Sequence, residues 1–208
     1  LIVAAISVAG LVYLGQQTYS GAPPLVDFVS ADTGEVFLSQ KQIERGKEVF
    51  HLRGLMGYGS FWGDGGDRGP DFTADALHRT VVSMREYYTR QMLAQTGAAA
   101  LTEYERDAIG QRVMREMRNN TFDEAAGTIT LNSAQMNAFE ELNVHYTRMF
   151  TDPTYKDRME PINQVNGEEN IRAVTGFFFW GGWVSAANRP GQTYSYTHNW
   201  PYDPDVGN

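Results

Sequence analysis

The sequence predicts a mostly α-helical protein with a small β element and a membrane-embedded N-terminus. Apolar residues recur at helical spacing in five segments between residues 39 and 188. Two short stretches, 25–39 and 121–132, instead carry the β-branched and turn residues that are typical of hairpins. The chain also begins with an uncharged apolar run. A length of 208 residues is enough for one domain with a sizeable core.

The N-terminal run, "LIVAAISVAGLVYLG", has the composition of a membrane-spanning segment. A spanning helix needs about 20 apolar residues. We therefore expect residues 1–20 to be the C-terminal part of a truncated transmembrane helix, with Tyr13 and Tyr19 at the membrane–water interface. A signal-peptide core or a buried helix are the alternatives, although the basic region and cleavage pattern of a signal peptide are not visible in this segment.

Residues 21–38 are expected to form a connecting arm. Pro23 and Pro24 stop the first helix, because proline has no N–H to donate and its ring clashes with the preceding turn. Short apolar pairs on either side of "DTGE" predict a small hairpin within this arm.

Five further helices are expected after the arm, most of them with a recognisable cap. Their expected ranges and caps are 39–52 with Ser39, 73–97 with Thr73 at its start and Gly97 at its end, 101–120 with the capping box Thr102 and Glu105, 133–150 with Ser133, and 170–188. The run Thr128 to Leu131 predicts a second hairpin between the third and fourth of these helices. Residues 151–169 and the proline- and glycine-rich tail after residue 188 are expected to be loops.

The composition excludes several classes of function. The formal net charge is −8, and there is no Lys/Arg-rich face to neutralise phosphates, so we expect no nucleic-acid partner. The chain contains no cysteine. Disulfides, thiolate metal sites and covalently attached c-type haem are therefore all excluded.

The stretch "HLRGLMGYGSFWGDGGDRGPDFTADALH", residues 51–78, is the most unusual part of the chain. Three of its aspartates, Asp64, Asp67 and Asp71, stand among glycines, and calcium favours carboxylates on flexible loops. The pattern is neither an EF-hand nor a Walker loop. The alternative interpretation is that Asp71 and Thr73 cap the next helix, while Asp64 and Asp67 are solvated turn residues.

The histidines give no sign of a metal site, because none of them forms a closely spaced ligand pair. We expect all four to be structural or on the surface; they are His51, His78, His145 and His198. A noncovalent b-type haem bound through His51 or His78 is a further hypothesis.

The segment "FFFWGGW" places Phe177, Trp180 and Val184 on one face of a helix. Such an aromatic stripe is typical of a protein core. It is equally typical of a surface that docks on a membrane-embedded partner or on the membrane interface. The sequence leaves both interpretations open.

Three blocks of the sequence resemble the N-terminal periplasmic region of quinol-dependent nitric oxide reductases, members of the haem–copper oxidase superfamily. The blocks are "GKEVFHLRGLMGYGSFWGDGGDRGPDFTADALHR", "ANRPG" and "THNWPYDPDVGN", and the resemblance runs from about Asp32 to Asn208. It implies a cytochrome c-like helical domain without haem over residues 39–176. Residues 177–208 would then be an aromatic helix and a tail leading to a catalytic transmembrane bundle outside this chain.

The resemblance implies an accessory role in a quinol:nitric oxide oxidoreductase of the plasma membrane. The domain would lie on the periplasmic side, and the bundle would reduce two NO to N₂O. No catalytic residue is expected in this chain. The implied cofactors of the parent are haem b, haem b3, non-haem iron and calcium, and the implied partners are the bundle, quinol and the membrane. The alternative is a membrane-anchored metal- or ligand-binding module without a catalytic partner in the same chain.

The resemblance also assigns individual residues. Leu55, Tyr58 and Gly59 stand where cytochrome-dependent relatives have the two cysteines and the histidine of a haem site, so the loop is interpreted as a former haem-binding loop. Gly65 and Asp67 match the calcium-binding positions, with Asp67 in place of the usual tyrosine.

The space that haem occupies in the relatives needs an occupant in this chain. We expect four large aromatic side chains to fill it because of their position and volume: Phe61, Trp62, Phe178 and Trp180. An open cavity beside Phe61 and Trp62 would contradict this expectation.

Overall fold

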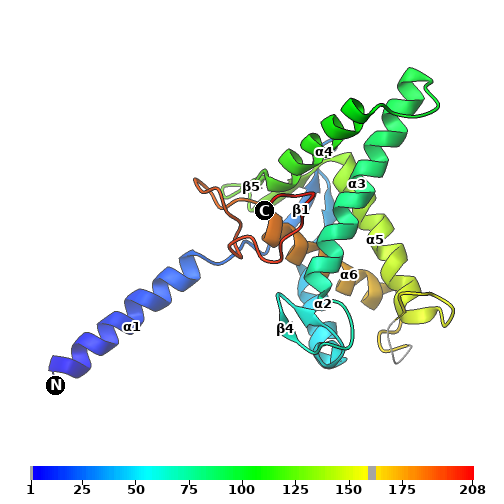
Figure 1. Cartoon of the computed structure of the whole chain (residues 1–208). Coiled ribbons are helices and arrows are strands. Elements are labelled where there is room, and N and C mark those ends of the chain that lie inside the picture. The colour runs from blue at the N-terminus through cyan, green and yellow to red at the C-terminus, as the bar shows by residue number, and fades with distance from the viewer. Residues whose placement is uncertain (1, 159–162) are drawn as a thin grey trace.

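The computed structural model describes residues 2–158 and 163–208, and it is mostly helical, as predicted (Figure 1). A 3₁₀ turn, η1 (Leu55–Gly57), follows the second helix. The α-helices are α1 (Ile2–Ser20), α2 (Gln40–Leu52), α3 (Phe72–Thr96), α4 (Glu103–Arg118), α5 (Ser133–Thr151) and α6 (Glu168–Ala186). The predicted loop over 151–169 is confirmed within residues 152–158 and 163–167, while residues 159–162 lie outside the described residues.

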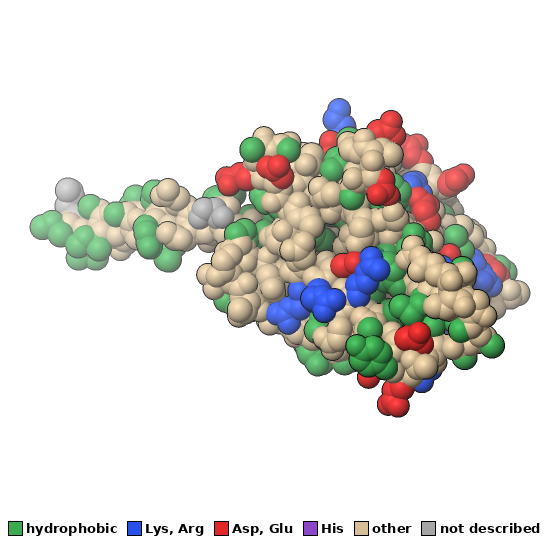
Figure 2. Space-filling model, turned by 90° about the horizontal axis from the view of Figure 1, so that it is seen from above, with side chains coloured by type: hydrophobic (Ala, Val, Ile, Leu, Met, Phe, Trp, Pro, Cys, Tyr) green, Lys and Arg blue, Asp and Glu red, His purple; other side chains and the backbone are tan. Residues whose placement is uncertain are grey.

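Helix α1 projects away from the rest of the protein (Figure 1). Its described side chains from Ile2 to Tyr19 are almost all exposed, and its length and composition suffice to cross a membrane. Figure 2 shows hydrophobic side chains along this helix, whereas acidic and basic groups are scattered over the domain. The exposure of α1 contradicts the alternative of a buried helix and supports a membrane anchor.

The strands form two small sheets. Both predicted hairpins are confirmed, since β1 (Asp27–Ser30) pairs with β2 (Val36–Leu38), and β5 (Phe122–Asp123) pairs with β6 (Thr128–Leu131), each antiparallel. The sequence did not predict that β1 and β6 pair in parallel, which joins the hairpins into one sheet of order β2-β1-β6-β5.

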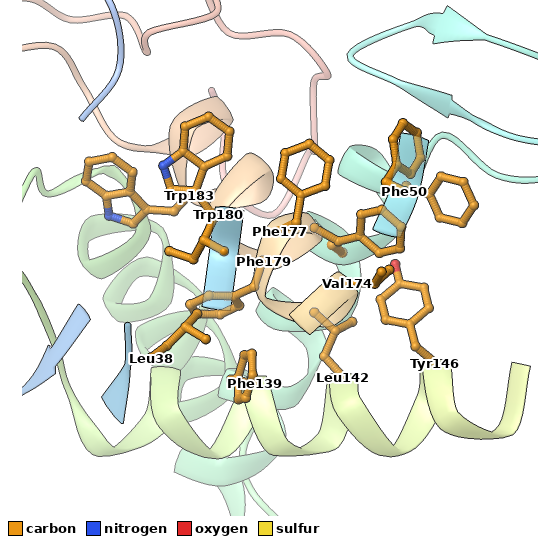
Figure 3. Close-up of a cluster of buried hydrophobic side chains, with 14 of the residues drawn as sticks. Leu38, Phe50, Phe139, Leu142, Tyr146, Val174, Phe177, Phe179, Trp180 and Trp183 are labelled. Atoms are coloured by element: carbon orange, nitrogen blue, oxygen red, sulfur yellow. The ribbon is translucent and has the colours of Figure 1, made fainter. Parts of the chain in front are cut away.

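Helix α6 lies at the centre of the core and packs against α2, α3 and α5. Its aromatic side chains point to several sides: Phe177 lies 5.7 Å from Phe50 of α2, and Phe179 lies 5.5 Å from Phe139 of α5, measured between ring centroids (Figure 3). The core interpretation of the aromatic stripe is therefore confirmed. At Gly46, α2 approaches α6 so closely that a Cβ would lie 2.0 Å from a backbone oxygen of α6.

Most of the predicted caps are confirmed. Ser39 and Thr102 accept hydrogen bonds from the backbone N–H groups of Gln42 and Glu105 and complete capping boxes with these residues. Gly97 ends α3 in the left-handed conformation, with φ of 67°, which glycine adopts without steric cost.

Two predicted caps are wrong by one or two residues. Asp71, not Thr73, is the N-cap of α3, and Thr73 Oγ1 instead accepts a hydrogen bond from the Trp62 N–H. Asn132, not Ser133, is the N-cap of α5, and Ser133 instead donates to Asp32 across the fold. In both places two neighbouring polar residues could cap the helix. The one that does not cap forms a hydrogen bond elsewhere, Thr73 with Trp62 and Ser133 with Asp32.

The C-terminal tail has no helix among its described residues, as predicted, and it folds back over the domain. Its Val206 is buried in a second apolar cluster with side chains of α3 and α4. Asn208 donates to the backbone oxygens of Ser185 and Pro201, which fixes the tail against the end of α6.

Candidate functional site

The glycine-rich loop between α2 and α3 is packed against itself. A Cβ on Gly59 would lie 2.4 Å from the Pro70 carbonyl oxygen, and one on Gly66 would lie 2.7 Å from the Gly57 oxygen. The strands β3 (Ser60–Phe61) and β4 (Asp64–Gly65) pair within the loop. Gly59 and Gly66 are thus required by close contacts with backbone atoms inside the loop.

Asp71 holds this loop in shape. Its Oδ2 accepts hydrogen bonds from Ser60 Oγ and from the Gly63 N–H, both at 2.7 Å. Its Oδ1 accepts from the Ala74 N–H at 2.9 Å, which caps α3. The interpretation of Asp71 as a capping residue is confirmed, and the same carboxylate also ties the loop to the helix.

The other two aspartates of the loop, Asp64 and Asp67, are exposed, as solvated turn residues are expected to be. Calcium takes six to eight oxygen ligands. The predicted positions offer the Asp67 carboxylate and the Gly65 carbonyl. Among the described residues, Asp67 belongs to no group of three carboxylate or histidine side chains that could hold a metal ion. The two predicted positions therefore offer fewer oxygen atoms than a calcium ion takes.

The three positions assigned to a former haem site make protein contacts. Leu55 is fully buried in the core, and Tyr58 is half-buried against it. Gly59 lies against Pro70. Of the three, only Tyr58 has a side chain that could ligate iron.

An apolar cavity of about 310 Å³ lies between the loop, α2 and α6. The Phe61 ring stacks on the Phe177 ring, with centroids 4.3 Å apart and an interplanar angle of 5°. The Trp62 and Trp180 rings lie 5.7 Å apart. The lining residues are Leu25, Ile43, Glu44, Lys47, Phe50, His51, Met56, Phe61, Trp62, Asp64, Phe177 and Trp180.

This cavity contradicts the prediction that Phe61, Trp62, Phe178 and Trp180 together fill the space. Phe178 is fully buried and stacks on Phe72, but the other three line the cavity. The two indoles are held at the wall by hydrogen bonds of their Nε1–H groups. Trp62 donates to Ser185 Oγ at 3.1 Å, and Trp180 donates to the Pro24 oxygen at 2.9 Å.

Charged groups stand at the edge of the cavity. Glu44, Lys47 and His51 come from α2, and Asp64 comes from β4; all four residues are exposed. His78 borders a different cavity, beside Asp75 and His145. The two histidines of the b-type haem hypothesis thus belong to separate sites.

Sequence reasoning missed a buried polar cluster around Asp75 of α3. Tyr146 Oη donates to Asp75 Oδ2 at 2.9 Å, Arg79 Nε donates to Oδ1 at 2.8 Å, and His145 Nε2 lies 3.3 Å from Oδ2. Burial raises the pKa of Asp75, but the nearby His145 imidazole and the charge of Arg79 outweigh it and hold that pKa below its usual value. Burial together with the Asp75 charge raises the pKa of Tyr146 well above its usual value.

A second missed cluster joins the tail to α3. His78 Nδ1 lies 2.9 Å from Asp203 Oδ2, and potential ligand atoms of His78, Asp203 and Asp205 all lie within 4.8 Å of one another. Arg85 forms an ion pair with Asp205. No local motif could reveal either cluster, because Asp75 lies 71 positions from Tyr146 and His78 lies 125 positions from Asp203.

The fold and the site together define a class: a membrane-anchored helical domain with an aromatic-lined cavity beside a glycine-rich loop. The family model of the NorB cytochrome c-like domain of nitric oxide reductase matches residues 27–202. The chain belongs to this family. The resemblance seen in the sequence is confirmed at this level. A comparison with curated proteins finds no match.

Proposed function

We propose that the chain is the periplasmic accessory domain of a quinol-dependent nitric oxide reductase in the plasma membrane. The family match over residues 27–202 carries the proposal, and α1 supplies the anchor. The chain has no cysteine, so it lacks the covalent haem attachment expected of cytochrome-dependent relatives. Without such a haem, the domain cannot pass electrons from a cytochrome to the bundle, which agrees with quinol as the direct electron donor.

The proposed reaction takes place in a transmembrane bundle that carries haem b, haem b3 and non-haem iron. Quinol gives up two electrons and two protons, which balance the conversion of two NO to N₂O and water. The residues of the present chain do not touch the reacting atoms in this proposal. They cover the periplasmic side of the bundle and shape the surroundings of the quinol.

Calcium belongs to the same proposal. Gly65 and Asp67 would supply two oxygen ligands, and the bundle would supply the others. A hard oxygen donor set of this kind suits calcium. The exposure of both residues supports a position at an interface with a partner.

The experiment that tests the proposal is an amperometric measurement of NO loss in membranes that contain the full-length parent. We expect consumption that starts on addition of a quinol and does not start on addition of the oxidised quinone. Membranes without the parent are the control. A parent with its haems loaded that consumes no NO with quinol, but does so with a reduced cytochrome, would contradict the quinol dependence.

The alternative, a membrane-anchored ligand-binding module, has one observation in its favour, which is the apolar cavity of about 310 Å³. The two proposals differ in the sequence that they require after residue 208 in the parent gene. Repeated apolar spans with ligating histidines would support the reductase, and a stop codon would support the module.

A further inference from the structure

We propose that the cavity between α2, α6 and the glycine-rich loop binds a phospholipid of the membrane, with an acyl chain inside and a zwitterionic, phosphatidylethanolamine-type headgroup at the edge. This inference goes beyond the proposed reductase function. It depends on the anchor helix and on the chemistry of the cavity, and it does not depend on the electron donor.

The first argument is the position of the cavity beside the membrane anchor. Leu25 lines the cavity, and the Trp180 Nε1–H of its wall donates to the oxygen of Pro24. Both residues belong to the short linker after Ser20, the last residue of α1. Five residues span at most about 17 Å even when fully extended, so Leu25 in the cavity wall lies within that distance of the end of α1.

The second argument is the nature of the wall. A cavity of about 310 Å³ with mainly apolar and aromatic walls has the size and lining of a ligand site. The indoles of Trp62 and Trp180 are fixed by hydrogen bonds and do not close it. An acyl chain is the apolar ligand that an adjacent bilayer supplies.

The third argument is the charge at the edge. Lys47 can bind a phosphate, while Glu44 and Asp64 can accept hydrogen bonds from an ammonium group. Two carboxylates and one ammonium leave the edge net negative while His51 is neutral. A purely anionic headgroup is therefore disfavoured, and a headgroup that carries both a phosphate and an ammonium group fits.

The fourth argument is a pair of exposed aromatic side chains in the C-terminal tail, one of which lies beside the glycine-rich loop. Trp200 and Tyr202 are 56% and 63% exposed. A Cβ on Gly63 would lie 3.3 Å from Trp200 Nε1, which places that indole beside the loop that carries Trp62. Exposed Trp and Tyr are enriched where proteins meet the membrane–water interface. An exposed indole of this kind therefore lies beside the loop that forms one wall of the cavity.

The test uses the full chain, with α1, in nanodiscs. Native mass spectrometry counts the lipids that remain bound after gentle release from discs of phosphatidylethanolamine, phosphatidylcholine or phosphatidylglycerol. We expect one retained phosphatidylethanolamine, held at least about tenfold more tightly than phosphatidylglycerol, because one charge-assisted hydrogen bond is worth roughly that factor. Phosphatidylcholine, whose ammonium has no N–H to donate, should be retained less.

Variants connect the retained lipid to the cavity. Met56→Phe adds volume at a half-buried wall position and should abolish retention. Val144→Phe makes a comparable addition at an exposed position of α5 and is the matched control. Glu44→Gln should remove the preference for phosphatidylethanolamine. Circular dichroism of all variants excludes misfolding as the cause.

A second measurement reports on the cavity directly. The variant with Trp183→Phe and Trp200→Phe keeps only the cavity indoles Trp62 and Trp180. We expect lipids with brominated acyl chains to quench their fluorescence, and Met56→Phe to prevent this quenching. Equal retention in Met56→Phe, no retained lipid, or a retained quinone in place of a phospholipid would overturn the proposal. None of these outcomes involves NO consumption, so a failure here differs from a failure of the proposed reductase function.

Discussion

Gly59 shows how a single missing side chain shapes the loop. A Cβ at this position would lie 2.4 Å from the Pro70 oxygen and 2.7 Å from the Phe72 ring. We predict that Gly59→Ala lowers the free energy of unfolding by about 3 kcal/mol, because backbone and a buried ring must shift to admit the methyl group. Chemical denaturation followed by circular dichroism measures this change.

Gly57, two residues earlier in the same loop, is the matched control. A Cβ there meets nothing within 4 Å. Gly57→Ala should therefore leave the free energy of unfolding within about 0.5 kcal/mol of the wild-type value. Equal losses in the two variants would show that the loop requires glycine for backbone freedom and that the close approach to Pro70 is not the reason.

Asp75 makes stability depend on pH. Its pKa in the folded state lies below the ordinary value of 3.8, so the stability that it contributes is present above that value and is lost as the pH falls through the folded-state pKa. We predict that Asp75→Asn lowers the free energy of unfolding by about 2 kcal/mol at neutral pH, because Arg79 and Tyr146 lose a charged partner. The variant should also lose less stability than the wild type when the pH falls from 5 to 3, as measured by denaturation at each pH. A parallel pH dependence in both proteins would contradict this account.

Local sequence identified most capping residues because a cap requires only one short polar side chain before a helix. It placed two caps on the wrong neighbour. Asp71, and not Thr73, caps α3 because the Trp62 N–H donates a hydrogen bond to the Thr73 hydroxyl oxygen. That partner is brought in by the fold of the loop, so helix-start rules alone do not reveal it.

At the scale of elements, the crossing of α2 and α6 is set by Gly46. We predict that Gly46→Ala lowers the free energy of unfolding by at least about 3 kcal/mol, because the new methyl group would overlap the Ala173 backbone of α6. Gly110→Ala in α4 is the contrasting control. There the added methyl group meets only the flexible end of Arg85, and the helix should gain about 0.5–1 kcal/mol. Thermal unfolding of both variants measures the difference.

The helices could be predicted because each shows apolar periodicity within its own sequence. The joining of the two hairpins could not be predicted. Strands β1 and β6 are about 100 positions apart, and the sequence of either hairpin does not indicate which strand edges pair. The cavity was not predicted for a related reason. Aromatic volume suggested a filled space, but the fixed directions of the two indoles depend on Ser185 and Pro24, which are distant in the chain.

At the scale of the whole molecule, the proposed calcium site leads to a testable prediction. We predict that the 208-residue chain alone shows little or no shift in its melting temperature when calcium is added at millimolar concentration, because two exposed oxygen donors fall well short of the six to eight that calcium takes. The parent with its bundle should instead be stabilised by calcium, and Asp67→Ala should abolish that effect. Strong stabilisation of the chain alone would show that the site is complete without the bundle.

Membership of the family is also recognised from long stretches of the chain and not from single residues. The blocks around the glycine-rich loop and the tail were sufficient to suggest it, because glycine, proline and aspartate are tied there to specific backbone contacts. The middle helices contributed little, since their apolar stripes satisfy many helical folds equally well. Sequence could therefore indicate the family before it could indicate how the elements pack.

The parallel pairing of β1 with β6 imposes an order of events when the chain is made. Strand β1 leaves the ribosome soon after the anchor, yet its partner is completed only at Leu131. Until then, only the edge of β1 that faces β2 can be paired, and its other edge stays open because pairings of such high sequence separation form slowly. One edge of the first strand to be synthesised therefore waits for a partner that lies about 100 positions later in the chain.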